Sequence, residues 1–369
     1  MKNIAVFFGG QSIEHDVSVI TGVLTLNTID KTKFNAIGVY IDSDGKFYIG
    51  KDLCDIDNFS KLNMKKLTQV TFVLGDNGLY KIKNKKTQKL LSISAAINCL
   101  HGERGEDGCL SSLMKMCGIA LCSPDLLSAS ISMDKTITKY ILKGLRINCL
   151  PYITVRKNQS VNEKIIKFSY PVIVKPATGG SSIGINVAND FNQMKGALAN
   201  AFQFGEYVII EPLLSNFVEI NCAAYKNSKG EIIVSSCERP VGRTEILCFN
   251  DKYKDGKREF PANIENKFSD KIQQITKEIY EKLMFNGIVR IDFFIKNEKV
   301  YVNEINSVPG SLAYYLFSDT LKGFSEILTD IIEKSLKDFA QSLTQKRIYN
   351  SGILTDVGSK GAKRLKKKI

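Results

Sequence analysis

The residues of this sequence best suited to chemistry are two acids, an amide and an arginine at short spacing: Asp292, Glu304, Asn306 and Arg290. Carboxylate and amide oxygens are hard ligands of the kind that Mg²⁺ prefers, and this ion usually leaves its remaining positions to water and nucleotide phosphates. The set therefore predicts a magnesium site that holds a phosphate-bearing substrate. The alternative is a group of acids that simply face water, because alternating strands commonly have one wet face.

These side chains belong to a predicted β-hairpin. Within residues 287–310, two runs of alternating apolar and polar residues, 288–295 and 300–305, flank a short polar turn. Side chains along a strand repeat with a period of two, so Arg290 and Asp292 are expected on one face of the first strand. On the second strand, Val302 is expected to share a face with the acid and the amide. The hairpin can therefore bring the chemical groups together.

Two turns in the N-terminal part of the chain also place polar groups at the carboxyl ends of predicted strands. Residues 3–8 form an apolar strand that ends at Gly-Gly before a helix, which places Glu14 and His15 at the helix N-terminus, facing a cleft. A second apolar strand, 95–100, runs into HGERGEDG and puts His101 at its end. Both histidines of the chain thus follow strand ends, where each could be structural or functional. The first turn lacks GxGxxG, which argues against dinucleotide binding.

A glycine-rich loop follows the apolar strand that ends at Lys175. The backbone N–H groups of residues 178–182 could cradle phosphate oxygens, because small residues leave them accessible. The loop does not match the Walker A pattern, and an ordinary hairpin turn is the alternative. A later apolar strand ends at Glu211, and Leu214 and Glu219 follow it. These three could line an adenine slot and reach a ribose.

Several helices can be placed by their termini. Asp134 is a plausible N-cap and Gly144 a plausible C′ residue of one helix. Periodic apolar residues predict further helices at 190–204 and 266–284, and an amphipathic helix that ends near residue 343. Between them, the polar stretch 237–262 is long enough to be a lid or a disordered loop.

Composition narrows the class of protein. The 369 residues, 44% of them hydrophobic, suffice for two or three globular domains. No run approaches the roughly 20 apolar residues that cross a bilayer, which predicts a cytoplasmic protein without membrane insertion. Nine cysteines are scattered without CxxC spacing, so neither a zinc site nor a disulfide framework is expected.

The net charge of +13 is concentrated at the C-terminal end, where six basic residues lie within 360–368. No aromatic residues are interleaved with them, which argues against a nucleic-acid-binding protein. The same stretch has no apolar period and is expected to be disordered.

Taken together, these segments resemble the D-alanine:D-alanine ligase family of the ATP-grasp superfamily. The matching motifs, in the family's order, are GGQSIEHDVS, HGERGEDG, MDK at 133–135, VKPATGGSSIG, DKY at 251–253, and RIDFF with NEINSVPG. The resemblance implies an α/β (α+β) ATP-grasp fold of three domains. These are an N-terminal open parallel-sheet substrate domain at 1–124, a central subdomain with the glycine loop at 125–211, and a C-terminal subdomain with the metal site and lid at 212–345, followed by a basic tail at 346–369.

The resemblance also implies the reaction and its participants. The carboxylate of a first D-alanine attacks the γ-phosphate of ATP, and the amine of a second D-amino acid then attacks the acyl phosphate. The product serves peptidoglycan precursor synthesis in the cytoplasm. The implied cofactors are ATP and two Mg²⁺ ions, or Mn²⁺ in their place, and the implied assembly is a homodimer.

For the nucleotide and metal, the resemblance implies roles by position in the motifs. ATP is held by Lys135, Lys175, Glu211, Leu214, Glu219 and the lid residue Lys252. The metal ligands are Asp292, Glu304 and Asn306.

The resemblance also implies which residues bind the two amino-acid substrates. Arg290 and the Gly310 N–H form the oxyanion site. The first substrate's ammonium is held by Glu14, with Ser181 and Tyr253 as hydrogen-bonded partners, and His101 lies nearby. The stretch that contacts the second substrate corresponds to Ser311 and Leu312.

Departures from the family pattern leave the second substrate open. Tyr314 and Tyr315 stand where the family is commonly small, Pro212 stands where a lysine is common, and Thr178 where a longer polar side chain is frequent. Bulk in a pocket wall favours small D-amino acids, with D-alanine preferred and D-serine tolerated. Ligases that join D-alanine to D-serine or D-lactate, or another carboxylate to an amine, are the alternatives within this class. Tyr253 favours the dipeptide-forming type, and no metal ligand or lysine is missing, as it would be in a non-catalytic relic.

Overall fold

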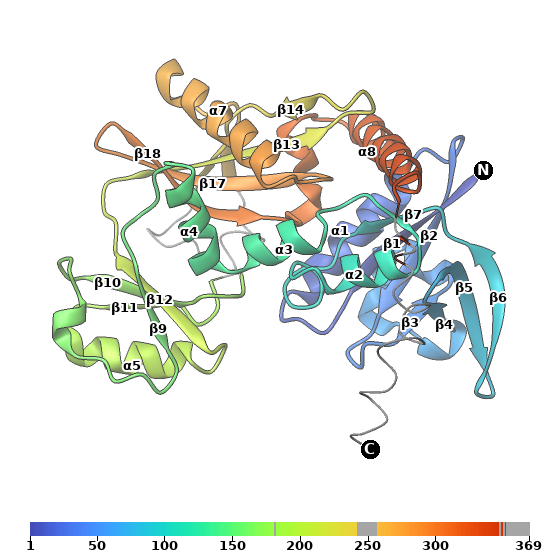
Figure 1. The fold of residues 1–369 in the computed structure, drawn as a ribbon, viewed down its shortest axis with the longest axis horizontal. Helices are drawn as coiled ribbons and strands as arrows, with labels where there is room; N and C mark the ends of the chain where they lie inside the picture. The colour runs from blue at the N-terminus through green and yellow to red at the C-terminus, as the bar shows by residue number, and fades with distance from the viewer. Residues whose placement is uncertain (181, 242–256, 347, 350, 352–369) are drawn as a thin grey trace.

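The structure is a computed structural model that describes residues 1–180, 182–241, 257–346, 348–349 and 351. Ser181, the predicted lid residues Lys252 and Tyr253, and most of the basic tail lie outside the described residues. Three sheets follow one another along the chain, and in Figure 1 the first lies at the right, the second at the lower left and the third at the top.

The N-terminal sheet has eight strands in the order β6-β5-β4-β3-β2-β1-β7-β8. One half is parallel and consists of β1 (Lys2–Gly9), β2 (Phe34–Ile41), β7 (Ala95–Asn98) and β8 (Ala120–Leu121). The other half is an antiparallel extension of β3 (Phe47–Ile49), β4 (Thr68–Val73), β5 (Asp76–Lys83) and β6 (Lys86–Ser92). Strand β1 is central because its apolar run is buried on both faces, as parallel strands require. Helices α1 (His15–Thr28) and α2 (Cys109–Met116) follow β1 and β7.

The central sheet is antiparallel in the order β11-β10-β12-β9. Its strands are β9 (Ile153–Arg156), β10 (Val172–Pro176), β11 (Asn186–Ala188) and β12 (Tyr207–Pro212). Helix α5 (Phe191–Ala201) begins after the N-cap Asp190, whose side chain accepts from the Gln193 N–H. Its apolar side chains share one buried cluster with the strands, so the helix covers one face of this sheet.

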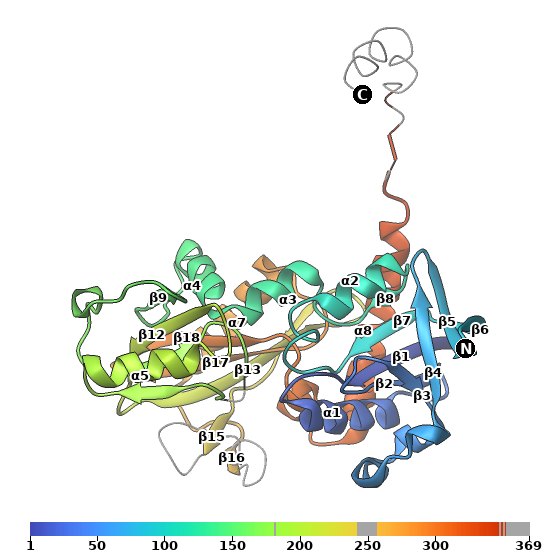
Figure 2. The same cartoon turned by 90° about the horizontal axis from the view of Figure 1, so that it is seen from below.

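The C-terminal sheet, in the order β14-β13-β17-β18, contains the predicted hairpin. Its strands are β13 (Val218–Lys226), β14 (Ile232–Val234), β17 (Val289–Lys296) and β18 (Lys299–Asn306), and helix α7 (Asn266–Lys282) packs against it. A separate two-stranded sheet joins β15 (Arg239–Val241) and β16 (Lys257–Glu259), seen below β13 in Figure 2. The hairpin of β17 and β18 confirms the sequence prediction within one residue at each end.

A β-bulge changes one detail of that hairpin. Asp292 pairs with Glu304, but the next residue of β17, Phe293, pairs with Val302, so Asn303 is the extra residue. Val302 consequently lies with Phe293 in the apolar core and both are fully buried. The expectation that Val302 shares the face of Glu304 was therefore wrong, because period-two reasoning cannot register an inserted residue.

Three further helices pack against the strands of these sheets. Helices α3 (Leu126–Met133) and α4 (Lys135–Gly144) pack near β18, and α8 (Leu321–Ser342) packs beside β7 and β8 of the N-terminal sheet (Figures 1 and 2). Thus the last helix returns to the first sheet, and one apolar cluster spans both ends of the described chain. The division into domains at 124, 211 and 345 stays a prediction.

The predicted start of α4 is confirmed, and its predicted end is wrong. Asp134 is its N-cap and accepts from the N–H groups of Thr136 and Ile137, as predicted. Gly144, however, is still helical, and the left-handed residue that ends the turn is Arg146, at φ 59°. The glycine misled the prediction because an exposed arginine can adopt this conformation at modest cost.

Candidate active site

A cleft of about 910 Å³, including the space open to solvent at its mouth, lies between the central and C-terminal sheets. The predicted nucleotide residues that line it are Lys135, Lys175, Glu211, Leu214 and Glu219, together with the glycine loop from Thr178 to Gly180. Phe217 and Phe294 form an edge-to-face pair in its wall, with ring centroids 4.8 Å apart. The cleft thus combines an apolar slot with positive charge, which suits a base and its phosphates.

Lys135 is tied to the glycine loop. It opens helix α4, and its Nζ donates to the Gly179 carbonyl at 2.6 Å. Gly179 has a φ of +98°, a conformation that glycine adopts without steric cost. Burial, followed among the lowering causes by the like charge of Lys175, lowers the pKa of Lys135. An anionic group bound beside these two lysines would relieve their repulsion.

A buried charge cluster borders this cleft. Glu211, 1% exposed, lies with its two oxygens 2.5 Å from Lys139 Nζ and 2.6 Å from Lys175 Nζ. Burial alone would raise the pKa of Glu211, but the two ammonium groups outweigh it and hold the pKa below its usual value. Lys175, which the sequence assigns to phosphate, is therefore paired with a carboxylate here.

The hairpin brings its polar residues together as predicted. Arg290 holds Asp292 with two parallel contacts, Nε at 2.7 Å and one terminal nitrogen at 3.0 Å, and Asn306 Nδ2 donates to Asp292 at 3.1 Å. Glu304 pairs with Asp292 across the two strands. Because the amide nitrogen of Asn306 is turned to Asp292, its oxygen remains to coordinate a cation, so two carboxylates and an amide oxygen fit Mg²⁺. Among the described residues, no cluster of three His, Cys, Asp or Glu side chains is assembled for a softer metal.

A second, smaller cavity adjoins the nucleotide cleft. Its lining includes Glu14 and His101 from the N-terminal sheet and Arg290, Asn306 and Gly310 from the C-terminal part. Glu304 and Gly180 line both the cleft and this cavity. The two spaces therefore meet at the predicted metal ligand and the glycine loop.

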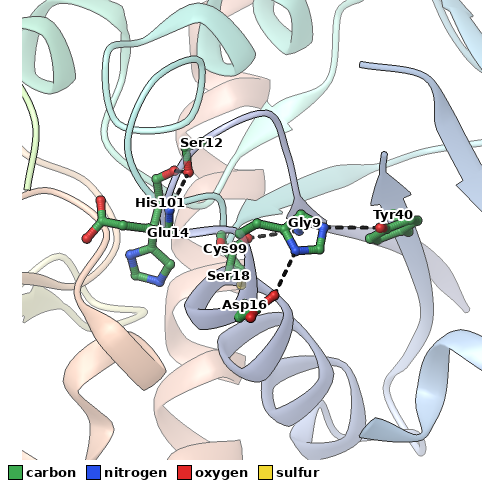
Figure 3. A network of polar contacts seen from close by, with 9 residues as sticks. Gly9, Ser12, Glu14, Asp16, Ser18, Tyr40, Cys99 and His101 are labelled. Carbon is green, nitrogen blue, oxygen red and sulfur yellow. Dashed lines mark hydrogen bonds and ion pairs between the residues drawn. The ribbon is translucent and has the colours of Figure 1, made fainter. Parts of the chain in front are cut away.

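The predicted strand ends are locked to each other by side-chain hydrogen bonds (Figure 3). Ser18 accepts from the Gly9 N–H at 2.9 Å and donates to the Cys99 carbonyl at 2.7 Å, which ties the ends of β1 and β7 to α1. Ser12 donates to the His101 carbonyl at 2.6 Å. Glu14 is the N-cap of α1 and is 5% exposed. A Cβ placed on Gly180 would lie 3.1 Å from a Glu14 carboxylate oxygen, so the acid and the glycine loop face each other across the cavity.

The two histidines differ. His101 lies in the cavity wall and is 4% exposed, and burial, followed by the charge of Arg290, lowers its pKa to about 4. His15 instead bonds the Tyr40 hydroxyl through Nε2 and Asp16 through Nδ1, both at 3.1 Å. His15 is therefore a structural residue, and the expectation that it faces the cleft beside Glu14 was wrong, because α1 turns successive side chains to different directions.

The described side chains that follow Gly310 do not form the wall of the smaller cavity, as the argument from bulky residues had assumed. Leu312 is 6% exposed and its side chain packs in the core, while its N–H donates to the Pro309 carbonyl at 2.8 Å. Tyr314 stacks on Phe324 with ring centroids 4.6 Å apart, and Tyr315 lies beneath the Arg258 guanidinium. Among the described residues, neither tyrosine lines the smaller cavity. The prediction that their bulk restricts the second substrate to small D-amino acids therefore gains no support from the cavity lining.

Three functional candidates escaped sequence reasoning. Glu106 lines the cavity and accepts from the N–H groups of Gly102 at 2.8 Å and Val308 at 3.3 Å. Burial raises the pKa of Glu106 to about 8, with Glu14 and Glu304 adding to it. The other two are Lys139 and Thr21.

One signal for Lys139 was present in the sequence. It follows Lys135 by four residues, on the stripe of α4 that also carries the buried residues Thr138 and Leu142. A lysine on an apolar stripe indicates a buried acid as its partner. Glu106 and Thr21 left no comparable signal, because the partners that join them to the Gly310 turn, Val308 and Ser311, are remote in sequence.

No helix among the described residues has the length and apolar character needed to span a membrane. Each cysteine that the structure describes is a free thiol.

Comparisons with known proteins agree with this geometry. Family models described as "D-ala D-ala ligase N-terminus" and "D-ala D-ala ligase C-terminus" match residues 3–124 and 141–335. The chain is 35% identical to the D-alanine–D-alanine ligase of Thermosipho melanesiensis, over 92% of this chain and 95% of that one.

Solved structures give the same result. The D-alanine–D-alanine ligase of Helicobacter pylori superimposes with a TM-score of 0.73 at 30% identity, over 94% of this chain and 100% of that one. The VanG D-Ala:D-Ser ligase of Enterococcus faecalis superimposes with a TM-score of 0.78 at 26% identity, over 90% and 99% of the two chains. With both family models matched in order and the predicted site assembled between the sheets, this chain belongs to the D-alanine–D-alanine ligase family.

Proposed function

We propose that this protein joins two D-alanines to D-alanyl-D-alanine through an acyl phosphate, with ATP as the phosphate donor. The observation that carries this proposal is the meeting of the nucleotide cleft and the smaller cavity at Glu304 and Gly180. A carboxylate bound in the cavity would lie next to the terminal phosphate of a nucleotide in the cleft. Phosphoryl transfer depends on such positioning and on charge neutralisation more than on a protein nucleophile.

In the first step, Glu14 would hold the ammonium of the first D-alanine at the N-terminus of α1. The carboxylate of this D-alanine then attacks the γ-phosphate of ATP, which forms an acyl phosphate and releases ADP. Lys135 and Lys175 neutralise phosphate charge, and Lys175 exchanges Glu211 for the phosphate. Asp292, Glu304 and Asn306 would hold two Mg²⁺ or Mn²⁺ ions, which supply neutralisation of the phosphate oxygens when bound.

In the second step, the amine of the second D-alanine attacks the acyl carbon. The new C–N bond forms first and gives a tetrahedral intermediate. Its C–O bond to phosphate then breaks, and the proton that the amine loses leaves with the released phosphate. Arg290 and the Gly310 N–H would stabilise the oxyanion of the tetrahedral intermediate, and donors of this kind are typically worth a factor of about 10² to 10³ each. Ser181, Lys252 and Tyr253, which lie outside the described residues, would complete the site from the glycine loop and the lid. Ser311 and Leu312 would contact the second substrate.

The test is phosphate release and dipeptide formation with D-alanine as first substrate and D-alanine, D-serine or D-lactate as second. We expect the highest kcat/KM with D-alanine, and D-serine lower by roughly tenfold to a hundredfold, because a site that accepts the methyl side chain of D-alanine rejects an added hydroxyl only weakly. A kcat/KM highest for D-lactate, or no dipeptide with any of the three, would overturn the assignment. A maximum with D-serine would move the protein to the D-alanine:D-serine type.

We also infer that the enzyme works as a homodimer in the cytoplasm and supplies peptidoglycan precursor synthesis, as ligases of this family do. Light scattering on the purified protein tests the dimer, since a monomeric mass at micromolar concentration would contradict it.

A further inference from the structure

A buried hydroxyl connects the two loops that border the amino-acid cavity. Thr21, on α1, is fully buried. Its Oγ1 accepts from the Ser311 N–H at 2.9 Å and lies 3.1 Å from His101 Nε2. One side chain thus joins the turn after Gly310, the HGERGEDG loop and α1, three segments that come from opposite ends of the chain.

The turn that Thr21 holds is strained. Ser311, Leu312 and Ala313 have φ values of 51°, 50° and 47°. Three successive left-handed residues with side chains are rare, because each Cβ crowds the following carbonyl. Such conformations persist only where the surroundings fix them. Here the core fixes Leu312 and Ala313 by burial, and Thr21 fixes Ser311 by the hydrogen bond to its N–H.

The hydrogen bonds of Thr21 also specify where the proton on the histidine ring lies. An N–H can only donate, so Thr21 Oγ1 is an acceptor toward Ser311. Among the described residues, His101 Nε2 is the acceptor that remains for the threonine hydroxyl proton. A ring nitrogen that accepts a hydrogen bond is unprotonated, so the proton of the neutral ring belongs on Nδ1.

We propose that Thr21 is a positioning residue for ligation: it passes a hydrogen bond from the Ser311 N–H to His101 Nε2, which sets His101 as the Nδ1–H tautomer and holds the left-handed turn in register with Gly310. The proposal rests on the proposed function, because its kinetic consequence concerns the amino-acid cavity. The lowered pKa of His101 agrees with a neutral ring, in which Nδ1–H is the one donor available to a substrate oxygen.

The chain contains only two histidines, which makes a direct test possible. In protein labelled with [¹⁵N]histidine, long-range ¹H–¹⁵N spectra at pH 7.5 distinguish a protonated ring nitrogen from an unprotonated one. We expect His101 to show a protonated Nδ1 and an unprotonated Nε2 in the wild type and in Thr21→Ser, which keeps the hydroxyl. In Thr21→Val, of similar shape without the hydroxyl, we expect the Nε2–H tautomer to appear. His15 serves as the internal reference, assigned by His15→Gln.

Kinetics provide the second measurement. We expect Thr21→Val to lower kcat/KM for D-alanine roughly tenfold or more, because a buried donor is left unpaired, while the KM for ATP changes less than about twofold. Thr21→Ser should restore kcat/KM to within about threefold. Thr25→Val is the matched control: it removes a fully buried hydroxyl one turn along α1, paired with the Cys99 thiol. It should leave the His101 signals and the kinetics near wild type.

The spectra do not depend on activity, so the proposal and the proposed ligation can fail separately. A protonated Nε2 on His101 in the wild type would overturn the proposal, even if Thr21→Val failed to fold. So would unchanged His101 signals and an unchanged kcat/KM in folded Thr21→Val. Wild-type spectra as expected, with no dipeptide formed, would instead refute the proposed function alone.

Discussion

The buried carboxylate of Glu211 has two cationic partners, Lys139 and Lys175. If Lys175 turned from Glu211 to a bound phosphate, as the proposed function would allow, a buried carboxylate with no partner would be strongly destabilised. Lys139, at 2.5 Å on the other oxygen, remains with Glu211 after that exchange. Under the proposed function, Lys139 would thus let Lys175 move between a carboxylate and a phosphate without leaving an unpaired charge in the interior.

Glu304 lines both the cleft and the cavity, so replacing it should affect chemistry more than folding. We expect Glu304→Gln to lower phosphate release in Mg²⁺ by roughly a hundredfold or more, because the amide lacks the negative charge that a carboxylate ligand contributes to the metal site. Urea unfolding should stay within about 1 kcal/mol of wild type, since the shape is conserved. The control is Glu298→Gln in the exposed turn of the same hairpin, which loses only a surface ion pair with Lys267. Wild-type turnover by a folded Glu304→Gln protein would refute the metal assignment.

His101 makes a second prediction, on stability against pH. Its pKa of about 4 in the folded protein lies below the value of 6.5 expected when unfolded, so the unfolded state binds more protons between these limits. The contribution of neutral His101 to the free energy of unfolding is therefore fully present above pH 6.5 and is lost as the pH falls toward 4. We expect the unfolding free energy of the wild type to drop by about 2 kcal/mol relative to His101→Gln between pH 7 and pH 5. Parallel curves for the two proteins would show that the ring titrates normally.

Helix α1 lies close to β1 because of a glycine. A Cβ on Gly22 would lie 2.2 Å from the Phe8 Cβ, so the two elements leave no room for a methyl group. Alanine is normally better than glycine within a helix by roughly 0.5–1 kcal/mol. We nevertheless expect Gly22→Ala to destabilise the protein by about 1–3 kcal/mol through overpacking.

The matched control for Gly22 is Gly196→Ala in α5, where an added Cβ meets nothing within 4 Å. At this position only the higher helix propensity of alanine acts, so Gly196→Ala should stabilise the protein by about 0.5–1 kcal/mol. Urea unfolding of the two variants measures both effects. Equal changes of the same sign would mean that helix propensity, and not the approach of α1 to β1, governs Gly22.

Across the whole molecule, the two ends of the chain are joined at the cavity. Glu106 bonds Val308 over a separation of 202 residues, Thr21 bonds Ser311 over 290, and α8 packs on the N-terminal sheet. These contacts fix the Gly310 turn relative to the loop that contains His101. The site is therefore assembled by the complete chain and by neither end alone.

We expect Glu106→Gln to lower kcat/KM for D-alanine roughly tenfold, because an amide offers one acceptor oxygen where the carboxyl group serves two N–H donors. The KM for ATP should stay within about twofold, since the affected N–H groups border the amino-acid cavity. Glu103→Gln, an exposed acid of the same loop, is the control. Equal effects of the two substitutions would indicate a general electrostatic contribution in place of a specific bridge.

Local pattern determined much of this protein in advance. The hairpin of β17 and β18, the Asp134 cap and the polar groups at the ends of β1 and β7 all follow from periodicity and from residue types within a few positions. For this reason the sequence also predicted that Arg290, Asp292 and Asn306 would meet. Its motifs determined the family before any contact was known.

Only the tertiary structure decided which neighbours those groups have. The bulge at Asn303 sends Val302 into the core, and the turn of α1 directs His15 to Tyr40 and away from the cavity. Val308, which bonds Glu106, and Ser311, which bonds Thr21, lie 202 and 290 residues from their partners, and no local period encodes such pairings. They depend on how three sheets pack, and packing is a property of the whole chain.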